Sequence, residues 1–201
     1  MKKGDSMDKK LTVQQIRDIA KANDIEYAAL RAVIEVEAAG DGFLPDGKPK
    51  ILFEPHVFYK RMTDKRYITL RNRAMTENPS ICYPKWGQRP YGKVSEQHAR
   101  LATASTYERD TALESASWGM GQVMGYHWSA LGYETLQSFI NAMYRNEASQ
   151  LDAMIRFIRV NGLLDDLRRK DWARFARGYN GSGYAKNQYD KKLAAAYRKY
   201  A

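Results

Sequence analysis

The sequence lacks the features of a membrane-spanning or disulfide-stabilised protein. Its 201 residues include a single cysteine, Cys82, and no run near the roughly 20 apolar residues of a membrane span. Because one cysteine cannot form an internal disulfide, the fold must be held by its core, and Cys82 is expected to be an inert thiol. Residues 1–10 lack the apolar stretch of a secretory signal. We therefore expect synthesis in the cytoplasm and a flexible N-terminus over residues 1–10.

Acidic residues are in the minority, since 23 Asp and Glu stand against 33 Lys and Arg, a formal net charge of +10. This excess favours an anionic partner. Nucleic acid, an anionic membrane and a bacterial cell wall all qualify, but no recognised nucleic-acid motif supports the first. His56, His98 and His127 lack metal-ligand spacing, and no glycine-rich phosphate loop is present. Neither a metal nor a cofactor is expected.

Apolar residues make up 44% of the chain and recur mostly at helical spacing. This pattern predicts one mainly α-helical domain over residues 11–201. Thr12 and Gln15 predict a capping box at the start of the first helix. Helices are expected over residues 12–22, 23–38, 55–62, 96–108, 109–116, 120–131, 134–145, 147–161, 171–178 and 186–199.

Turn-forming residues predict the breaks between these helices. Asn23 or Asp24 is expected to cap the second helix, and the glycines at 40 and 42 are expected to end it.

Asp46-Gly47 is a hairpin-turn signal, and Ile51-Leu52-Phe53 fits a short strand. We therefore expect a small β-hairpin beside the helices. Residues 63–94 hold three prolines and interrupt the helical pattern. A loop this long inside a compact domain is usually functional or mobile.

One carboxylate lies on the apolar face of the second expected helix. Leu30, Val33, Ile34 and Glu37 are spaced i, i+3, i+4 and i+7, so they share a face that points to the core. Partial desolvation at the last turn would raise the pKa of Glu37, as a general acid requires near neutrality. Spacing alone does not make Glu37 catalytic, and a rim residue paired with a basic side chain remains the alternative interpretation.

By the same spacing, Glu35 faces solvent, with Arg31 as its expected partner.

Three segments, in order, resemble the lysozyme-like muramidases and lytic transglycosylases. Val36-Glu37-Ala38 resembles the catalytic glutamate motif, with alanine where the family usually has serine. Residues 117–124, which contain Gly119-Met120-Gly121-Gln122, resemble the segment that lines the glycan groove. Gly178-Tyr179-Asn180-Gly181 resembles the tyrosine–asparagine segment that closes the site, with an extra glycine at 178.

Residues 11–200 more specifically resemble the phage and prophage N-acetylmuramidase domain. The resemblance implies a lysozyme-like fold, a peptidoglycan substrate, no cofactor and Glu37 as general acid. It also implies a host-made protein that is released from the cytoplasm to the cell wall. The closer match is carried by residues 51–56, 115–119, 128–133 and 177–181.

Glycosidases typically use a second carboxylate. Glu54 is the candidate because it follows the hairpin, while Asp41 and Asp46 compete with it. Glu54 has the alternative roles of pairing with an arginine or capping the next helix.

Several other residues are expected to contact the sugar. Amide groups suit hydroxyl and acetamido groups, and aromatic rings suit sugar faces, although capping and core packing are the alternative roles. The expected substrate-binding residues are Gln122, Met120, Tyr179, Asn180, Trp118 and Tyr126, with Trp128 a further aromatic candidate.

Three function classes remain open on the sequence. The resemblance favours hydrolysis, with a lytic transglycosylase or a non-catalytic peptidoglycan-binding module as alternatives. Basic residues cluster over 60–73 and 186–199, where solvated surface is one interpretation and attraction to lipopolysaccharide phosphates another. A wall-binding element built into the catalytic domain is expected around residues 63–94. We expect a monomer.

Overall fold

The computed structural model describes residues 9–38 and 41–201. The flexible N-terminus predicted for residues 1–10 lies almost wholly outside this part of the chain, as does the helix-ending role of Gly40. The elements are α1 (Val13–Ala22), α2 (Tyr27–Glu37), β1 (Ile51–Phe53), α3 (Pro55–Asp64), α4 (Ile68–Glu77), η1 (Val94–Glu96), α5 (Gln97–Ser105), α6 (Arg109–Glu114), β2 (Ala116–Trp118), β3 (Val123–Met124), η2 (Gly125–His127), α7 (Leu136–Arg145), α8 (Glu147–Val160), α9 (Leu164–Arg169), α10 (Trp172–Asn180), η3 (Ser182–Ala185) and α11 (Tyr189–Tyr200).

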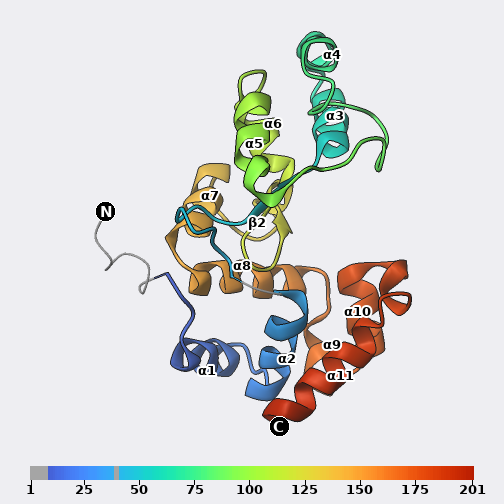
Figure 1. Cartoon of the computed structure of the whole chain (residues 1–201). Coiled ribbons are helices and arrows are strands. Elements are labelled where there is room, and N and C mark those ends of the chain that lie inside the picture. The colour runs from blue at the N-terminus through green and yellow to red at the C-terminus, as the bar shows by residue number, and fades with distance from the viewer. Residues whose placement is uncertain (1–8, 39–40) are drawn as a thin grey trace.

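Two apolar clusters form the core, and α8 contributes to both. One cluster packs the sheet with α3 to α7, and it includes Ala153 of α8. The other packs α1, α2 and α9 to α11 against Leu151, Met154 and Ile158 of α8. In Figure 1 the first group lies above α8, while α1, α2 and α11 of the second lie below it and α10 lies beside its right-hand end. The α8 helix thus supports the junction between the two halves of the molecule.

The sheet has three antiparallel strands in the order β1-β2-β3. The predicted strand at 51–53 is confirmed, but its partner is β2, with Leu52 opposite Ser117. The Asp46-Gly47 turn closes only a single bridge between Phe43 and Pro49. The mainly helical fold with a small β element is therefore confirmed, although β1 finds its partner far along the chain.

The helix predicted over 120–131 is wrong, because this segment holds β3 and the short η2 helix. Gly119 and Gln122 both take positive φ angles, 69° and 46°. Two such residues form a tight turn between β2 and β3 and are incompatible with a continuing α-helix.

The start of the second helix was also misplaced. Thr12 and Gln15 form the predicted capping box, but α2 begins at Tyr27 rather than after Asn23 or Asp24. Asn23 instead ends α1, where its N–H donates to carbonyls of that helix. Asp24 takes a left-handed φ of 52°, so neither residue is available to cap α2.

The predicted loop over 63–94 contains the unpredicted helix α4, and α9 was also missed. Irregular chain runs from Asn78 to Lys93. Cys82 is buried, and burial raises the pKa of its thiol to about 12, so it is chemically quiet as expected. Within the part of the chain seen here, no helix has the length and apolar character to span a membrane.

Candidate active site

Glu37 is the last residue of α2, at the junction between the two core clusters. Its side chain is half-buried, and the Asn180 side-chain amide at the end of α10 donates to its carboxylate oxygen Oε1 at 2.8 Å. Burial raises the pKa of Glu37, while the Asn180 hydrogen bond and the charge of Lys192 act in the opposite direction. The chain thus brings residues 37 and 180 together and keeps a proton on Glu37 to higher pH than on an exposed glutamate.

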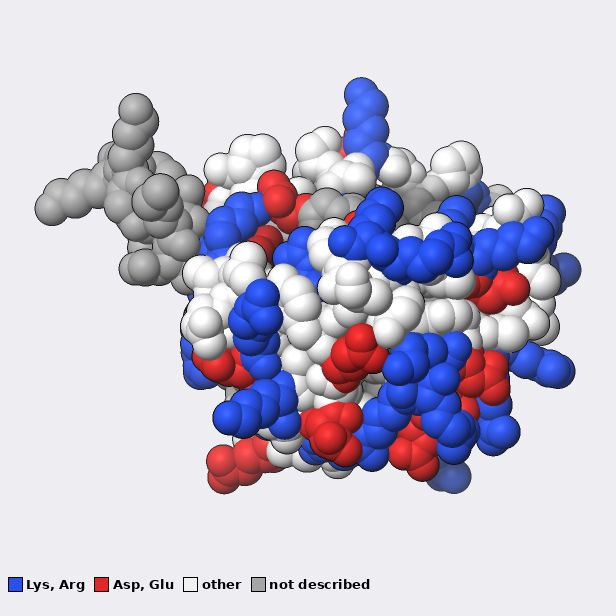
Figure 2. Space-filling model, turned by 90° about the horizontal axis from the view of Figure 1, so that it is seen from below, with Lys and Arg blue, Asp and Glu red and all other residues white. Residues whose placement is uncertain are grey.

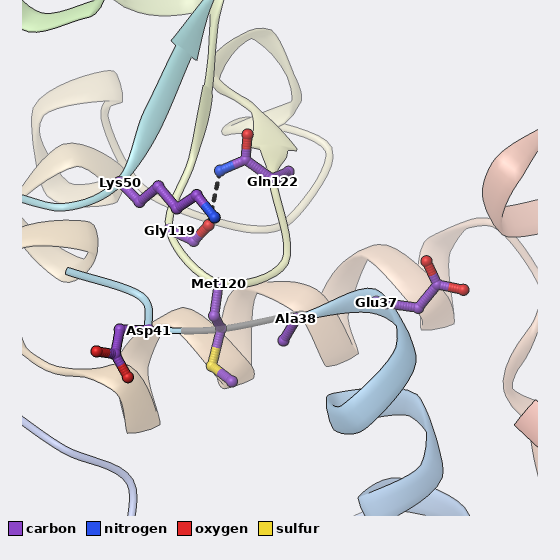
Figure 3. Close-up of a pocket in the computed structure, with 7 residues that line it drawn as sticks. All are labelled: Glu37, Ala38, Asp41, Lys50, Gly119, Met120 and Gln122. Atoms are coloured by element: carbon purple, nitrogen blue, oxygen red, sulfur yellow. Dashed lines mark hydrogen bonds between the residues drawn. The ribbon is translucent and has the colours of Figure 1, made fainter. Parts of the chain in front are cut away.

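A small pocket lies beside Glu37 at the turn between β2 and β3. Its volume is about 140 Å³. In Figure 3, Glu37 lies at one end, Asp41 at the other, and Lys50 and Gln122 between them. The lining residues are Glu37, Ala38, Asp41, Lys50, Gly119, Met120 and Gln122. Two of the segments identified in the sequence therefore meet in one cavity.

Gln122 lines the pocket, but its amide is already engaged in the turn. Its carbonyl accepts from the Ser117 hydroxyl at 2.9 Å, and its NH₂ donates to the Gly119 carbonyl at 2.8 Å. These bonds hold the pocket wall in shape. Each polar atom of the amide retains capacity for one further bond to a sugar group.

Tyr179 connects α10 to the same turn. Its hydroxyl donates to the Gly121 carbonyl at 3.2 Å, and its ring stacks on Phe175 with centroids 5.6 Å apart. Burial and the nearby charge of Glu37 raise the pKa of Tyr179, so it remains a neutral phenol. Tyr179 is therefore placed to fix the position of Asn180, its neighbour in sequence.

Two side chains from the first turn of α8 hold both walls of the pocket. Gln150 accepts from the Met120 N–H at 2.8 Å and donates to the Gly42 carbonyl at 3.2 Å. Glu147 accepts from the Gly42 N–H at 3.0 Å and from the Leu11 N–H at 2.8 Å. The segment after Glu37 and the turn at Met120 are thus tied to one rigid helix.

This close approach requires glycine. A Cβ at Gly119 would lie 2.7 Å from the side-chain Cδ of Gln150, and Gly119 already has a positive φ. The hydrogen bonds of Gln150 and Glu147 to Met120 and Gly42 were not predicted from the sequence. They join residues that are brought together only by the packing of α8.

The structure does not place Glu54 in this pocket. The Tyr91 hydroxyl donates to its carboxylate, and His56 Nδ1 lies 3.4 Å from the same oxygen. Glu54 directly precedes α3, but its side chain makes no capping hydrogen bond to that helix. Of its two competitors, Asp46 is exposed and pairs with Lys48.

Asp41, the other competitor, does line the pocket. Its side chain is 72% exposed, and it pairs with Lys10 at 2.5 Å.

The expected aromatic contacts divide into core and surface. Trp118 is 1% exposed, and its indole N–H donates to the Leu113 carbonyl, so this ring belongs to the core rather than to a sugar-contacting surface. Trp128 packs against the same core and donates to Glu114. Tyr126 is 38% exposed, under the guanidinium of Arg61 at 5.2 Å, and lies outside the pocket. Met120 is 6% exposed and lines the pocket.

Glu35 faces solvent as predicted, but its partner differs. It accepts from Lys199 and from the Tyr200 hydroxyl of α11, rather than from Arg31. Arg31 instead donates to the same tyrosine hydroxyl at 3.1 Å. Across residues 9–38 and 41–201, no group of three or more His, Cys, Asp and Glu side chains forms a metal-binding cluster.

Comparison with known proteins gives matches to a family model and to solved structures. A family model described as N-acetylmuramidase matches residues 26–201. Among solved structures, the chain matches the crystal structure of Burkholderia AP3 phage endolysin, with a TM-score of 0.86 and 41% sequence identity. The match covers 96% of this chain and 72% of that chain. No curated protein matches.

Proposed function

The chain belongs to the N-acetylmuramidase family, and from this premise we propose that it is a peptidoglycan hydrolase of the lysozyme-like glycosidase class. The bond cleaved is that between N-acetylmuramic acid and N-acetylglucosamine, and Glu37 is the general acid. The observation that carries the proposal is the environment of Glu37, which is half-buried, bonded to Asn180 and open to a pocket shared with Gln122. The likeness to a phage endolysin over nearly the whole chain supports it.

In this proposal, protonated Glu37 donates its proton to the glycosidic oxygen as the bond from the sugar C1 breaks. Positive charge then develops on the ring that contains this C1, the other sugar leaves as a neutral alcohol, and water adds to C1 to complete the hydrolysis. Asn180 orients the carboxyl, and Gln122 and Met120 form the wall against which the sugar lies. Tyr126 is a proposed stacking surface further from the reacting bond.

A second carboxylate would stabilise the ring or activate the water. Asp41 is a better candidate for this role than Glu54, because Asp41 lines the same pocket as Glu37. The Tyr91 contact favours Glu54 as a positioning residue that holds the irregular segment 78–93 against the start of α3.

The decisive variant is Glu37→Gln, which keeps the shape of the side chain and its contact with Asn180. Loss of a general acid typically lowers a rate by about 10²–10⁴-fold. Turbidity of purified sacculi and the helical circular dichroism spectrum are measured together. Glu35→Gln is the matched control, since it lies on the same helix and faces solvent.

Mass spectrometry of the soluble products tests the bond and the reaction type. Reducing-end N-acetylmuramic acid supports the proposal. Anhydro-muramic ends indicate a transglycosylase, and reducing-end N-acetylglucosamine moves the cleavage to the other bond. Lysis by folded Glu37→Gln at the wild-type rate would refute the assignment of Glu37. Binding of sacculi without any released product would indicate a non-catalytic binding module.

We further propose that residues 63–94 contain a wall-binding element of a monomeric catalytic domain. The support is the exposure of Tyr67, Ile68 and Trp86, which are 40%, 40% and 74% accessible. Lipopolysaccharide phosphates are a second anionic target, for the basic residues of the same segment. The proposed site of action is the cell wall, which the protein reaches after synthesis in the host cytoplasm.

A further inference from the structure

Lys50 is a charged residue of the pocket that the proposed mechanism leaves without a role. It lies immediately before β1 and lines the same cavity as Glu37. Its backbone is fixed by both walls of that cavity. The Lys50 N–H donates to the Gly42 carbonyl at 2.9 Å, and the Gly119 N–H donates to the Lys50 carbonyl at 2.8 Å. These two bonds hold the backbone of Lys50 at the edge of the pocket.

The charge of Lys50 is not compensated within the pocket. No carboxylate of residues 9–38 or 41–201 lies within 4.0 Å of its ammonium group, which also has no hydrogen bond in that part of the chain. Asp41 is the other acidic residue of the cavity besides Glu37, and it is paired with Lys10 at 2.5 Å. In Figure 3 the Lys50 side chain extends toward Gly119, with the carboxylate of Asp41 on one side of the pocket and that of Glu37 on the other.

Lys50 is half-buried, and an ammonium group that finds no partner among the described residues suits an anionic group of the ligand. In peptidoglycan, muramic acid differs from its neighbouring sugar by a lactyl arm whose carboxyl group carries the peptide stem. The carboxylates of this arm are the anions nearest to the glycosidic bond. An uncharged chain of N-acetylglucosamine has no such group.

We propose that Lys50 binds a carboxylate on the lactyl-peptide arm of muramic acid and thereby selects muramic-acid-containing strands. This inference rests on the proposed function and names the substrate feature read by the same pocket. Lys50 is a specificity residue, because it contacts the substrate away from the bond that breaks. The carboxylate is either the free lactyl group of a denuded strand or a carboxylate of the attached peptide.

The test pairs a protein change with a chemical change of the substrate. Lys50→Met removes the charge, and coupling methylamine to the carboxylates of the substrate removes the partner. Both are applied to intact sacculi and to strands denuded by an amidase. Lys48→Met is the matched control, because Lys48 belongs to the same segment but is exposed, pairs with Asp46 and lies outside the pocket. Lys50→Arg tests rescue by a retained charge.

We expect Lys50→Met to lower kcat/KM by about tenfold, mainly through KM, since a hydrogen bond to a charged group is worth about one order of magnitude. Neutralised substrate should lower wild-type kcat/KM by a similar factor and should not lower that of Lys50→Met further. An effect on denuded strands identifies the lactyl carboxylate, and an effect confined to sacculi identifies the peptide.

Equal losses for Lys50→Met on native and neutralised substrate would overturn the inference. So would unchanged activity on both native substrates. Failure of the proposed function is distinguished by the wild-type protein, which would then release no muropeptides from any substrate.

Discussion

Glu37 experiences two opposing influences on its proton. Burial raises the pKa of its carboxyl group, while the hydrogen bond from Asn180 and the charge of Lys192 lower it. The raising influence is the larger. The position of Glu37 at the end of α2 therefore gives its carboxyl group a raised pKa, which is the property that a general acid needs.

The activity should depend on pH through the proton on Glu37. A general acid must carry its proton, so kcat/KM falls as the pH rises through the pKa of Glu37 in the free enzyme. Asn180→Ala removes an influence that lowers this pKa. The basic limb of the profile should therefore move to higher pH, whatever the effect on the maximum rate.

Asn187→Ala, an exposed residue outside the pocket, serves as the control. If the basic limb of the kcat/KM profile moves to lower pH in Asn180→Ala, the assignment of Glu37 as the general acid is contradicted. Partial unfolding would reduce the height of the profile without moving this limb.

At the scale of elements, the first turn of α8 determines the pocket. Gln150 is 1% exposed and bonds to the Met120 N–H and the Gly42 carbonyl, one on each wall. A buried backbone group left without a partner costs about 1–3 kcal/mol. The stability of the fold and the shape of the site therefore share the same hydrogen bonds.

Gln150→Ala should lower the free energy of unfolding by about 2–4 kcal/mol, since the buried Met120 N–H loses its side-chain acceptor, the bonds to the Gly42 and Met143 carbonyls are lost, and packing volume is removed. Chemical denaturation measures this effect. The activity of the fraction that remains folded should also fall, mainly in kcat, because the Met120 wall is no longer fixed. Gln14→Ala on the exposed face of α1 is the control. Unchanged activity in fully folded Gln150→Ala would show that α8 contributes stability alone.

At the scale of the whole molecule, positive charge is widely distributed, but much of it is paired. Figure 2 shows the face formed by α1, α2 and α11, where acidic groups are interspersed with Lys and Arg. Two ion pairs on this side join α2 or the residue before it to later elements, Glu35 with Lys199 and Glu26 with Lys170. In the segment 78–93 no ion pair is formed by Lys85, Arg89 or Lys93 within the described parts of the chain, and Trp86 is the most exposed large apolar residue there.

We therefore expect binding of the inactive Glu37→Gln protein to sacculi to weaken as salt rises, because screening shortens the reach of these charges. Adding Trp86→Ala should weaken binding about threefold to tenfold at fixed salt. Val160→Ala, also exposed but on α8, is the control. Co-sedimentation measures both effects. Equal binding with and without Trp86 would remove the segment from the proposed wall-binding surface.

Local signals in the sequence determined the start of α1 and the half-buried position of Glu37. The capping box at Thr12 and the apolar spacing before residue 37 depend on neighbours within one or two turns, so they could be predicted without the fold. The resemblance placed residues 122 and 180 near Glu37, and the structure brings all three to one site.

Only the tertiary structure decided which residues line and hold the candidate pocket. The pairing of β1 with β2 brings Lys50 beside Gly119, and α8 brings Gln150 between Gly42 and Met120. The packing of the chain also buries Trp118 in the core and leaves Glu54 outside the pocket. These contacts join positions distant in sequence, and no local periodicity specifies which distant segments pack together.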